Sequence, residues 1–96
     1  MMVLLTYDVD VSSTEGRGRL RRVAKLCESY GIRVQNSVFE MMIDPAQYVL
    51  VKNRLEGLID KKTDSVRFYM LGKKWDAKVE TLGVTGLIAH GETMIL

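Results

Sequence analysis

Apolar and polar residues alternate at the start of the chain. Side chains two residues apart share one face of a β-strand. One such face is apolar or aromatic throughout: Val3, Leu5, Tyr7, Val9 and Val11. The other face begins apolar and ends acidic: Met2, Leu4, Thr6, Asp8 and Asp10. The pattern therefore predicts a strand with one core face. The second face suits neither solvent nor an ordinary core, and we interpret it as a site that another surface covers.

The next segment has apolar residues at helical spacing. Ser12, Ser13 and Thr14 offer hydroxyl caps for its start. The apolar stripe recurs at i, i+3, i+4 and i+7: Leu20, Val23, Ala24 and Cys27. Gly16 and Gly18 lower helix propensity and leave open a start one turn after Thr14. Gly31 suits a left-handed helix end.

A second helix is predicted after position 43. Asp44 can cap it, Pro45 suits its first position, and it ends at residues 61–63. Its apolar residues are Tyr48, Val49, Val51, Leu55, Leu58 and Ile59. The flanking segments 32–43 and 65–71 are each predicted to form one strand. In the first, one side carries Arg33, Gln35, Ser37 and Phe39.

This order of elements predicts an α+β fold, a ferredoxin-like βαββαβ sandwich in a single domain spanning residues 1–96. The motif needs one more short strand, for which residues 78–82 are the candidate, and residues 92–96 suggest a short C-terminal strand. Two helices on one face leave the other face open. That face would carry Leu4, Asp8 and Phe39, so we expect a homodimer that pairs two such faces.

Composition indicates in which cellular compartment this domain works. The 96 residues carry a net charge of +2 and one cysteine, Cys27, so no internal disulfide can form. No apolar run is long enough to span a membrane, and no signal peptide is visible at the start. We therefore expect a cytoplasmic protein with no membrane partner.

Basic residues gather in and after the first helical segment. Arginine binds phosphates through its planar guanidinium, so these side chains are candidates for nucleic-acid binding. They are Arg17, Arg19, Arg21, Arg22, Lys25 and Arg33. Charged residues on helices are usually only a solvated face, and Glu15 and Glu28 dilute this set. Composition alone leaves the two interpretations level.

Three stretches resemble a known family. They are Tyr7-Asp8-Val9, Tyr30-Gly31 and, most specifically, the run Arg33-Val34-Gln35-Asn36-Ser37-Val38-Phe39-Glu40. Together they resemble the small CRISPR-associated endonuclease of the spacer-adaptation complex, the partner of the CRISPR integrase. The resemblance implies a ferredoxin-like homodimer in which Asp8 from each chain binds one shared Mg²⁺ or Mn²⁺ and serves catalysis.

The same resemblance implies roles for nearby residues and favours nucleic-acid binding by the basic set. Asp8 is a metal ligand by this resemblance, whereas the pattern alone also allows a solvent-facing aspartate at a strand end. Ser37 and Phe39 would lie beside the metal, although for Phe39 we favour packing in the dimer. Asp10 shares the face of Asp8, but a turn-forming role suits it better.

Family members are linked to cleavage of single-stranded RNA or double-stranded DNA and to a structural role between integrase dimers. The resemblance therefore predicts a metal-dependent endonuclease of spacer acquisition and antiviral defence. Two alternatives stay open at this point. One is a non-catalytic DNA-binding scaffold that bridges integrase dimers. The other is a ribonuclease toxin of the virulence-associated type, which shares this small fold.

Overall fold

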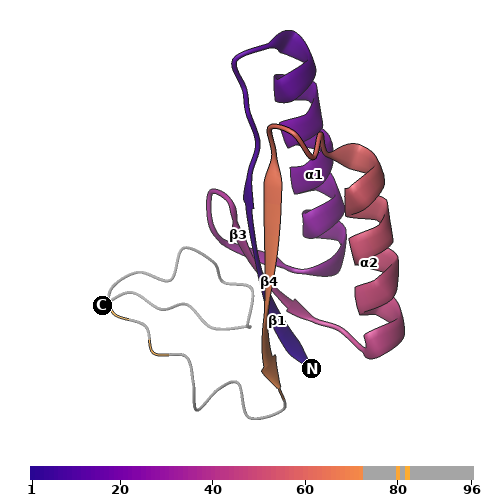
Figure 1. Ribbon diagram of the computed structural model, residues 1–96. Coiled ribbons are helices and arrows are strands. Elements are labelled where there is room, and N and C mark those ends of the chain that lie inside the picture. Colours follow the sequence, from indigo (N-terminus) through magenta and orange to yellow (C-terminus); the bar gives the residue numbers. More distant parts are fainter. Residues whose placement is uncertain (73–79, 81, 83–96) are drawn as a thin grey trace.

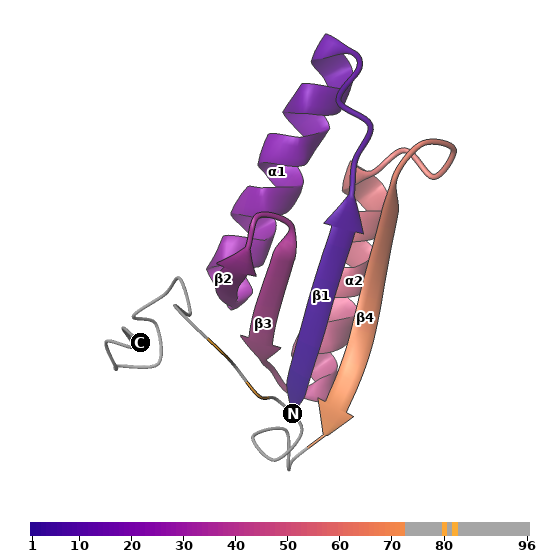
Figure 2. The same cartoon turned by 90° about the vertical axis from the view of Figure 1, so that its left-hand side faces the viewer.

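The described part of the chain folds as one sheet covered by two helices. The computed structural model describes residues 1–72, Glu80 and Leu82. Its elements are β1 (Met2–Asp8), α1 (Thr14–Tyr30), β2 (Ile32–Gln35), β3 (Val38–Met42), α2 (Pro45–Leu58) and β4 (Ser65–Gly72). All strand pairs are antiparallel, in the order β2-β3-β1-β4. Figures 1 and 2 show both helices on the same face of the sheet, which confirms the α+β, ferredoxin-like βαββαβ prediction.

The first strand lies inside the sheet, between β3 and β4. Its predicted core face is confirmed over most of its length: Val3, Leu5, Tyr7 and Val9 are all buried. Val9 and Val11 both lie beyond the end of β1, and of these two only Val11 is exposed. The face that ends in Asp8 changes from buried to exposed along the strand, which matches its change from apolar to acidic.

Helix α1 begins at Thr14, so the two glycines do not delay its start. The Ser13 hydroxyl accepts a hydrogen bond from the Gly16 N–H at 3.0 Å, as expected of an N-cap. A Cβ atom on Gly16 would overlap the carbonyl oxygen of Asp10, so glycine lets this helix start lie against the loop after β1. The stripe of α1 faces the sheet, with Val23 and Cys27 fully buried.

The left-handed conformation predicted for Gly31 is wrong. Its φ of −155° and ψ of −169° place it in the extended region that any residue adopts. Glycine is needed there for space, because a Cβ atom would lie 2.5 Å from the Glu40 carbonyl oxygen and 2.6 Å from Met41 Cγ. The chain therefore passes from α1 into β2 in close contact with β3.

The start of α2 is as predicted. The Asp44 side chain accepts a hydrogen bond from Gln47 N–H at 2.7 Å, and the Gln47 side chain accepts one from Asp44 N–H at 3.0 Å. This capping box, with Pro45 at the first turn, fixes the helix start. Val49 is exposed, so the predicted stripe was too wide, and the helix ends at Leu58, short of residue 61.

Segment 32–43 is two strands, and the prediction of one strand is wrong. A turn at Asn36 and Ser37 folds the segment into the β2–β3 hairpin. The hairpin supplies the strand that the motif required, so residues 78–82 are not needed for it. Those residues fall largely outside the described part of the chain, as does the predicted strand at 92–96. Within that part, no helix is long and apolar enough to cross a membrane.

Candidate active site at the end of the first strand

Asp8 is the last residue of β1, at the end of an inner strand of the sheet. In the β1–β4 ladder it lies directly opposite Ser65, the first residue of β4. Its side chain is exposed and forms no hydrogen bond or ion pair with any other described residue. Asp8 therefore presents a free carboxylate on a rigid support, which is what an external cation or substrate requires.

The turn between β2 and β3 lies beside this strand end. The Tyr7 N–H donates to the Ser37 carbonyl oxygen at 3.1 Å, and the Tyr7 hydroxyl donates to the Asn36 carbonyl oxygen at 3.1 Å. Burial raises the pKa of the Tyr7 hydroxyl, and the nearby Arg33 guanidinium offsets part of this effect, so the hydroxyl stays a neutral donor. Tyr7 thus holds the turn that contains Ser37 beside the end of β1.

Phe39 does not line this site, and its predicted place on the open face is wrong. It lies opposite Leu5 on the side of the sheet that faces the helices, and it is fully buried. The Tyr7 ring stacks beside it at 6.0 Å, and the Arg33 guanidinium lies 5.1 Å from its ring centroid. Arg33 pairs with Phe39 across the β2–β3 hairpin, so its planar guanidinium lies on the same face as this ring.

Asp10 acts in a turn. Its side chain accepts a hydrogen bond from the Ser12 N–H at 2.9 Å, and this bond lowers the pKa of the Asp10 carboxyl. Its own N–H donates to Asp64 Oδ1 at 3.0 Å. Asp10 is thus bound within the loop between β1 and α1, in line with the turn-forming role expected of it.

Asp64 is a residue that the sequence analysis missed. It is buried, with 8% of its surface exposed, and its carboxylate forms a salt bridge with Arg19 Nε at 2.8 Å. These partners are separated by 45 positions, so no local pattern could have paired them. The only available signal was an aspartate just before a strand. Arg19 is therefore committed to a structural contact and is not free to bind phosphates.

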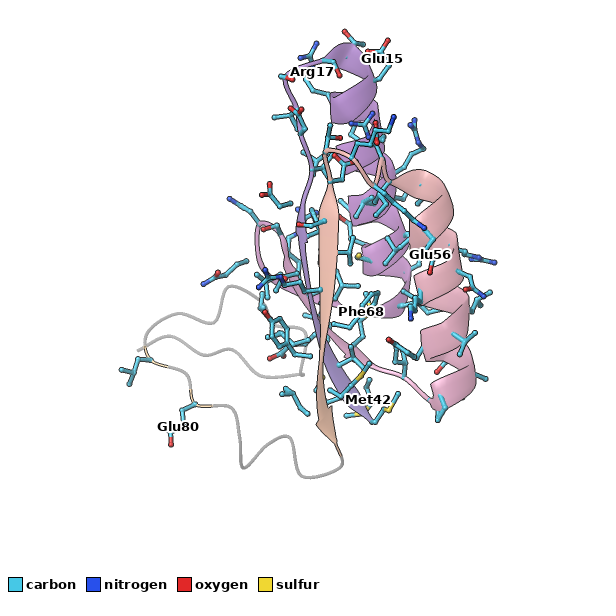
Figure 3. All side chains as sticks on the ribbon, viewed as in Figure 1. Glu15, Arg17, Met42, Glu56, Phe68 and Glu80 are labelled. Atoms are coloured by element: carbon cyan, nitrogen blue, oxygen red, sulfur yellow. The ribbon has the colours of Figure 1, made fainter. Side chains whose placement is uncertain are left out.

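The rest of the basic set divides in two. Arg33 forms an ion pair with Glu28 at 3.2 Å, which draws it away from an open phosphate-binding surface. Arg17, Arg21 and Lys25 are exposed at i, i+4 and i+8 of α1, so they form one stripe on the helix, with Arg22 exposed next to it. None of these four forms an ion pair with another residue of the described chain. Arg17 lies at the start of α1, where Figure 3 labels it.

A single chain offers an incomplete site for a divalent cation. The described residues contain no group of three or more His, Cys, Asp or Glu side chains that could hold a metal. Mg²⁺ is commonly bound through one or two carboxylates, with water as its other ligands. The free carboxylate of Asp8 fits such a site, provided that a second ligand comes from another molecule.

Three comparisons agree on the family of this chain. Residues 1–79 match the family model described as CRISPR associated protein Cas2. The chain is 48% identical to the CRISPR-associated endoribonuclease Cas2 3 of Rhodospirillum rubrum, over 98% of this chain and all of that protein. It is 53% identical to the CRISPR-associated endonuclease Cas2 of Halalkalibacterium halodurans, over 86% of each.

The fold also matches a solved structure. The crystal structure of Streptococcus pyogenes Cas2 at pH 6.5 superposes with a TM-score of 0.77 and 63% identity, covering 86% of this chain and all of that one. A match of this kind supports the expected fold, and the family model spans the strand that carries Asp8. The chain belongs to the CRISPR associated protein Cas2 family.

Proposed function

We propose that the protein is a metal-dependent endonuclease of CRISPR defence that hydrolyses phosphodiester bonds as a homodimer. The observation that carries this proposal is the free carboxylate of Asp8 at the end of an inner strand. Related proteins bear the names endoribonuclease and endonuclease, so single-stranded RNA and double-stranded DNA are both substrates to test. In the cell, the dimer would act in spacer acquisition with the CRISPR integrase.

The dimer would form through the face of the sheet that carries no helix. Leu4 lies opposite Glu40 on one side and Tyr69 on the other, so these three side chains form a row across this face. Tyr69 and Met42 are exposed there, which leaves a partly apolar surface on a small protein. Pairing two such faces about a two-fold axis would bury this surface and could bring the two Asp8 side chains together.

In this proposal Mg²⁺ or Mn²⁺ binds between two copies of Asp8. When bound, such an ion neutralises charge that develops on a phosphoryl group and lowers the pKa of a bound water. Asp8 holds the ion, and the turn at Ser37 borders the site. Arg17, Arg21 and Lys25 form a stripe on the exposed side of α1. In this proposal they bind backbone phosphates of the nucleic acid away from the bond that is cleaved.

The test is the Asp8→Asn variant, which keeps the shape of the side chain and removes its charge. We expect the variant to lose cleavage of RNA and DNA in Mg²⁺ or Mn²⁺, as the parent does in EDTA. Two carboxylates across a two-fold axis repel, so the metal-free dimer of the variant should be as stable as the parent, or slightly more so. The matched control is Glu56→Gln on α2, at the residue labelled in Figure 3. The Glu56 carboxylate is exposed and forms an ion pair with Lys61 at 3.6 Å.

Normal cleavage by Asp8→Asn would refute the proposal, and failure to fold would show that Asp8 is structural. If Asp8→Asn leaves DNA binding and spacer integration intact in a reconstituted reaction with the integrase, the protein serves there as a scaffold. That outcome would separate the cleavage reaction from the role in integration.

A further inference from the structure

The buried carboxylate of Asp64 joins three segments that are far apart in the sequence. Its Oδ1 accepts from the Asp10 N–H at 3.0 Å, in the loop after β1, and from the Thr63 hydroxyl at 3.0 Å. Its Oδ2 accepts from the Asp60 N–H at 2.9 Å, after α2, and from Arg19 Nε at 2.8 Å, on α1. Both oxygens are thus used, and the carboxylate ties the loop after β1 to both helical segments.

These bonds lie next to Asp8 in the fold. Asp64 directly precedes Ser65, and Ser65 lies opposite Asp8 in the β1–β4 ladder. The ladder between β1 and β4 ends at Asp8 and Ser65. The hydrogen bond from the Asp10 N–H to Asp64 keeps the segments that flank this end side by side two residues beyond Asp8. The backbone at Asp8 is therefore held by the ladder before it and by Asp64 after it.

Helix α1 holds the same stretch from another side. Its first turn lies so close to the Asp10 carbonyl oxygen that only glycine fits at position 16. Arg19, on the next turn, reaches Asp64 with its Nε and, at 3.5 Å, with a terminal nitrogen. The main chain at Asp10 is thus fixed through its N–H by Asp64 and through its carbonyl by the packing of Gly16.

The Asp64 carboxylate keeps its charge in this environment. Burial favours the neutral acid, but the hydrogen bonds from Arg19, Asp60, Asp10 and Thr63 outweigh it and hold the pKa of Asp64 well below its usual range. An amide in its place would turn one oxygen into a donor that faces N–H groups. A substitution as small as Asp64→Asn should therefore break the arrangement while it keeps the volume.

We infer that Asp64 is a positioning residue: it fixes the chain that leaves β1 and thereby sets the direction of the Asp8 carboxylate. The inference rests on the proposed role of Asp8 in metal binding. Residues that orient a metal ligand affect metal affinity about 10- to 100-fold in other proteins. If the Asp8 carboxylate is less firmly oriented, it should bind the metal ion more weakly. A higher concentration of Mg²⁺ should then restore cleavage.

The experiment compares Asp64→Asn with Val51→Ala, which removes volume from the core at a fully buried position of α2 and should lower stability. The first readout is the Mg²⁺ concentration that gives half-maximal cleavage, measured well below the melting temperature. We expect it to rise about tenfold or more in Asp64→Asn and to stay unchanged in Val51→Ala. A shift of equal size in both variants, or in neither, would overturn the inference.

The second readout needs neither metal nor cleavage. In the metal-free protein, Asp64→Asn should speed hydrogen exchange at the Asp10 amide and shift the ¹³C resonance of the Asp8 carboxylate. Unchanged signals at both positions would refute the positioning role. If Asp64→Asn does not fold, Arg19→Lys replaces it, since lysine keeps the charge and loses the Nε contact.

These readouts separate the two proposals. Normal cleavage by Asp8→Asn would refute the proposed metal site, yet the signals from Asp8 and Asp10 would still test whether Asp64 fixes the strand end. Loss of cleavage in Asp8→Asn together with an unchanged Mg²⁺ requirement in Asp64→Asn would refute only the positioning role.

Discussion

Leu5 of β1 lies directly opposite Phe39 of β3, and both side chains are fully buried between the sheet and the helices. Paired residues of this kind share a face, so the position of Phe39 follows from that of Leu5. This relationship removes Phe39 from the open face of the sheet. It also predicts that substitutions at Phe39 act on folding.

Phe39→Ala should lower the free energy of unfolding by about 3–5 kcal/mol, because it leaves a cavity between Tyr7 and Arg33. Phe39→Leu keeps more of the volume and should cost clearly less. Urea unfolding measures both, at one fixed protein concentration because dimerisation would add to the stability. A Phe39→Ala protein with normal stability but weaker association would contradict this core position.

Tyr69→Glu should weaken dimerisation through the open face. The substitution places a carboxylate in the row of Leu4 and Glu40, where a second copy would have to bury it. We expect the dissociation constant of the dimer to rise at least about tenfold, which sedimentation equilibrium can measure. The control is Leu50→Glu on α2, since Leu50 is 41% exposed and Tyr69 is 43% exposed. Equal effects of both changes would place the interface elsewhere.

The exposed stripe on α1 should contribute to nucleic-acid affinity through charge. Replacing Arg21 and Lys25 together by alanine should weaken binding to duplex DNA. If both residues contact phosphates, the negative slope of log K against log salt concentration should become shallower by about 1.8, which is about 0.9 for each lost contact. The control replaces Lys52 and Lys62, two exposed lysines outside α1, by alanine. If only the control pair changes the slope, the binding surface lies outside α1.

Cys27 should resist thiol reagents in the native protein. Burial raises the pKa of the Cys27 thiol to about 12, and the Arg33 guanidinium offsets only part of this effect. At pH 8 the native thiol should therefore react with iodoacetamide far more slowly than the same thiol in urea. Rapid labelling under native conditions would contradict the buried position.

The same shift links Cys27 to stability at high pH. A raised pKa in the folded state contributes stability that is fully present below the unfolded value of about 8.5. This contribution is lost as the pH rises from there towards about 12. Urea unfolding at pH 7 and pH 10 should therefore show a smaller loss of stability in Cys27→Ala than in the parent. The difference between the two proteins separates the effect of Cys27 from that of Tyr7, whose pKa is also raised by burial.

Several features of the fold could be predicted because their causes lie within a few residues. The alternation at Val3, Leu5 and Tyr7 marked the core face of β1, since side-chain direction in a strand depends only on parity. The caps at Ser13 and Asp44 fixed both helix starts through hydrogen bonds to residues three positions later. The same parity placed Asp8 on the other face of β1, at the exposed end of the strand.

Other features depended on contacts that no local pattern contains. The turn at Asn36 divided what looked like one strand, and the pairing of Phe39 with Leu5 then decided which face Phe39 occupies. Glycine is required at position 31 because β3, about ten residues later in the chain, passes too close to leave room for a Cβ atom. A rule about helix ends could not show this.

The surroundings of Asp8 show the same division. The sequence identified its carboxylate, but only the tertiary structure placed Asp64 next to that strand end and gave Arg19 to Asp64 as a partner. Hydrogen bonds and ion pairs between distant segments arise from the packing of helices on the sheet. The sequence by itself therefore determined the chemistry that Asp8 can offer, whereas the fold decided which residues hold it in place.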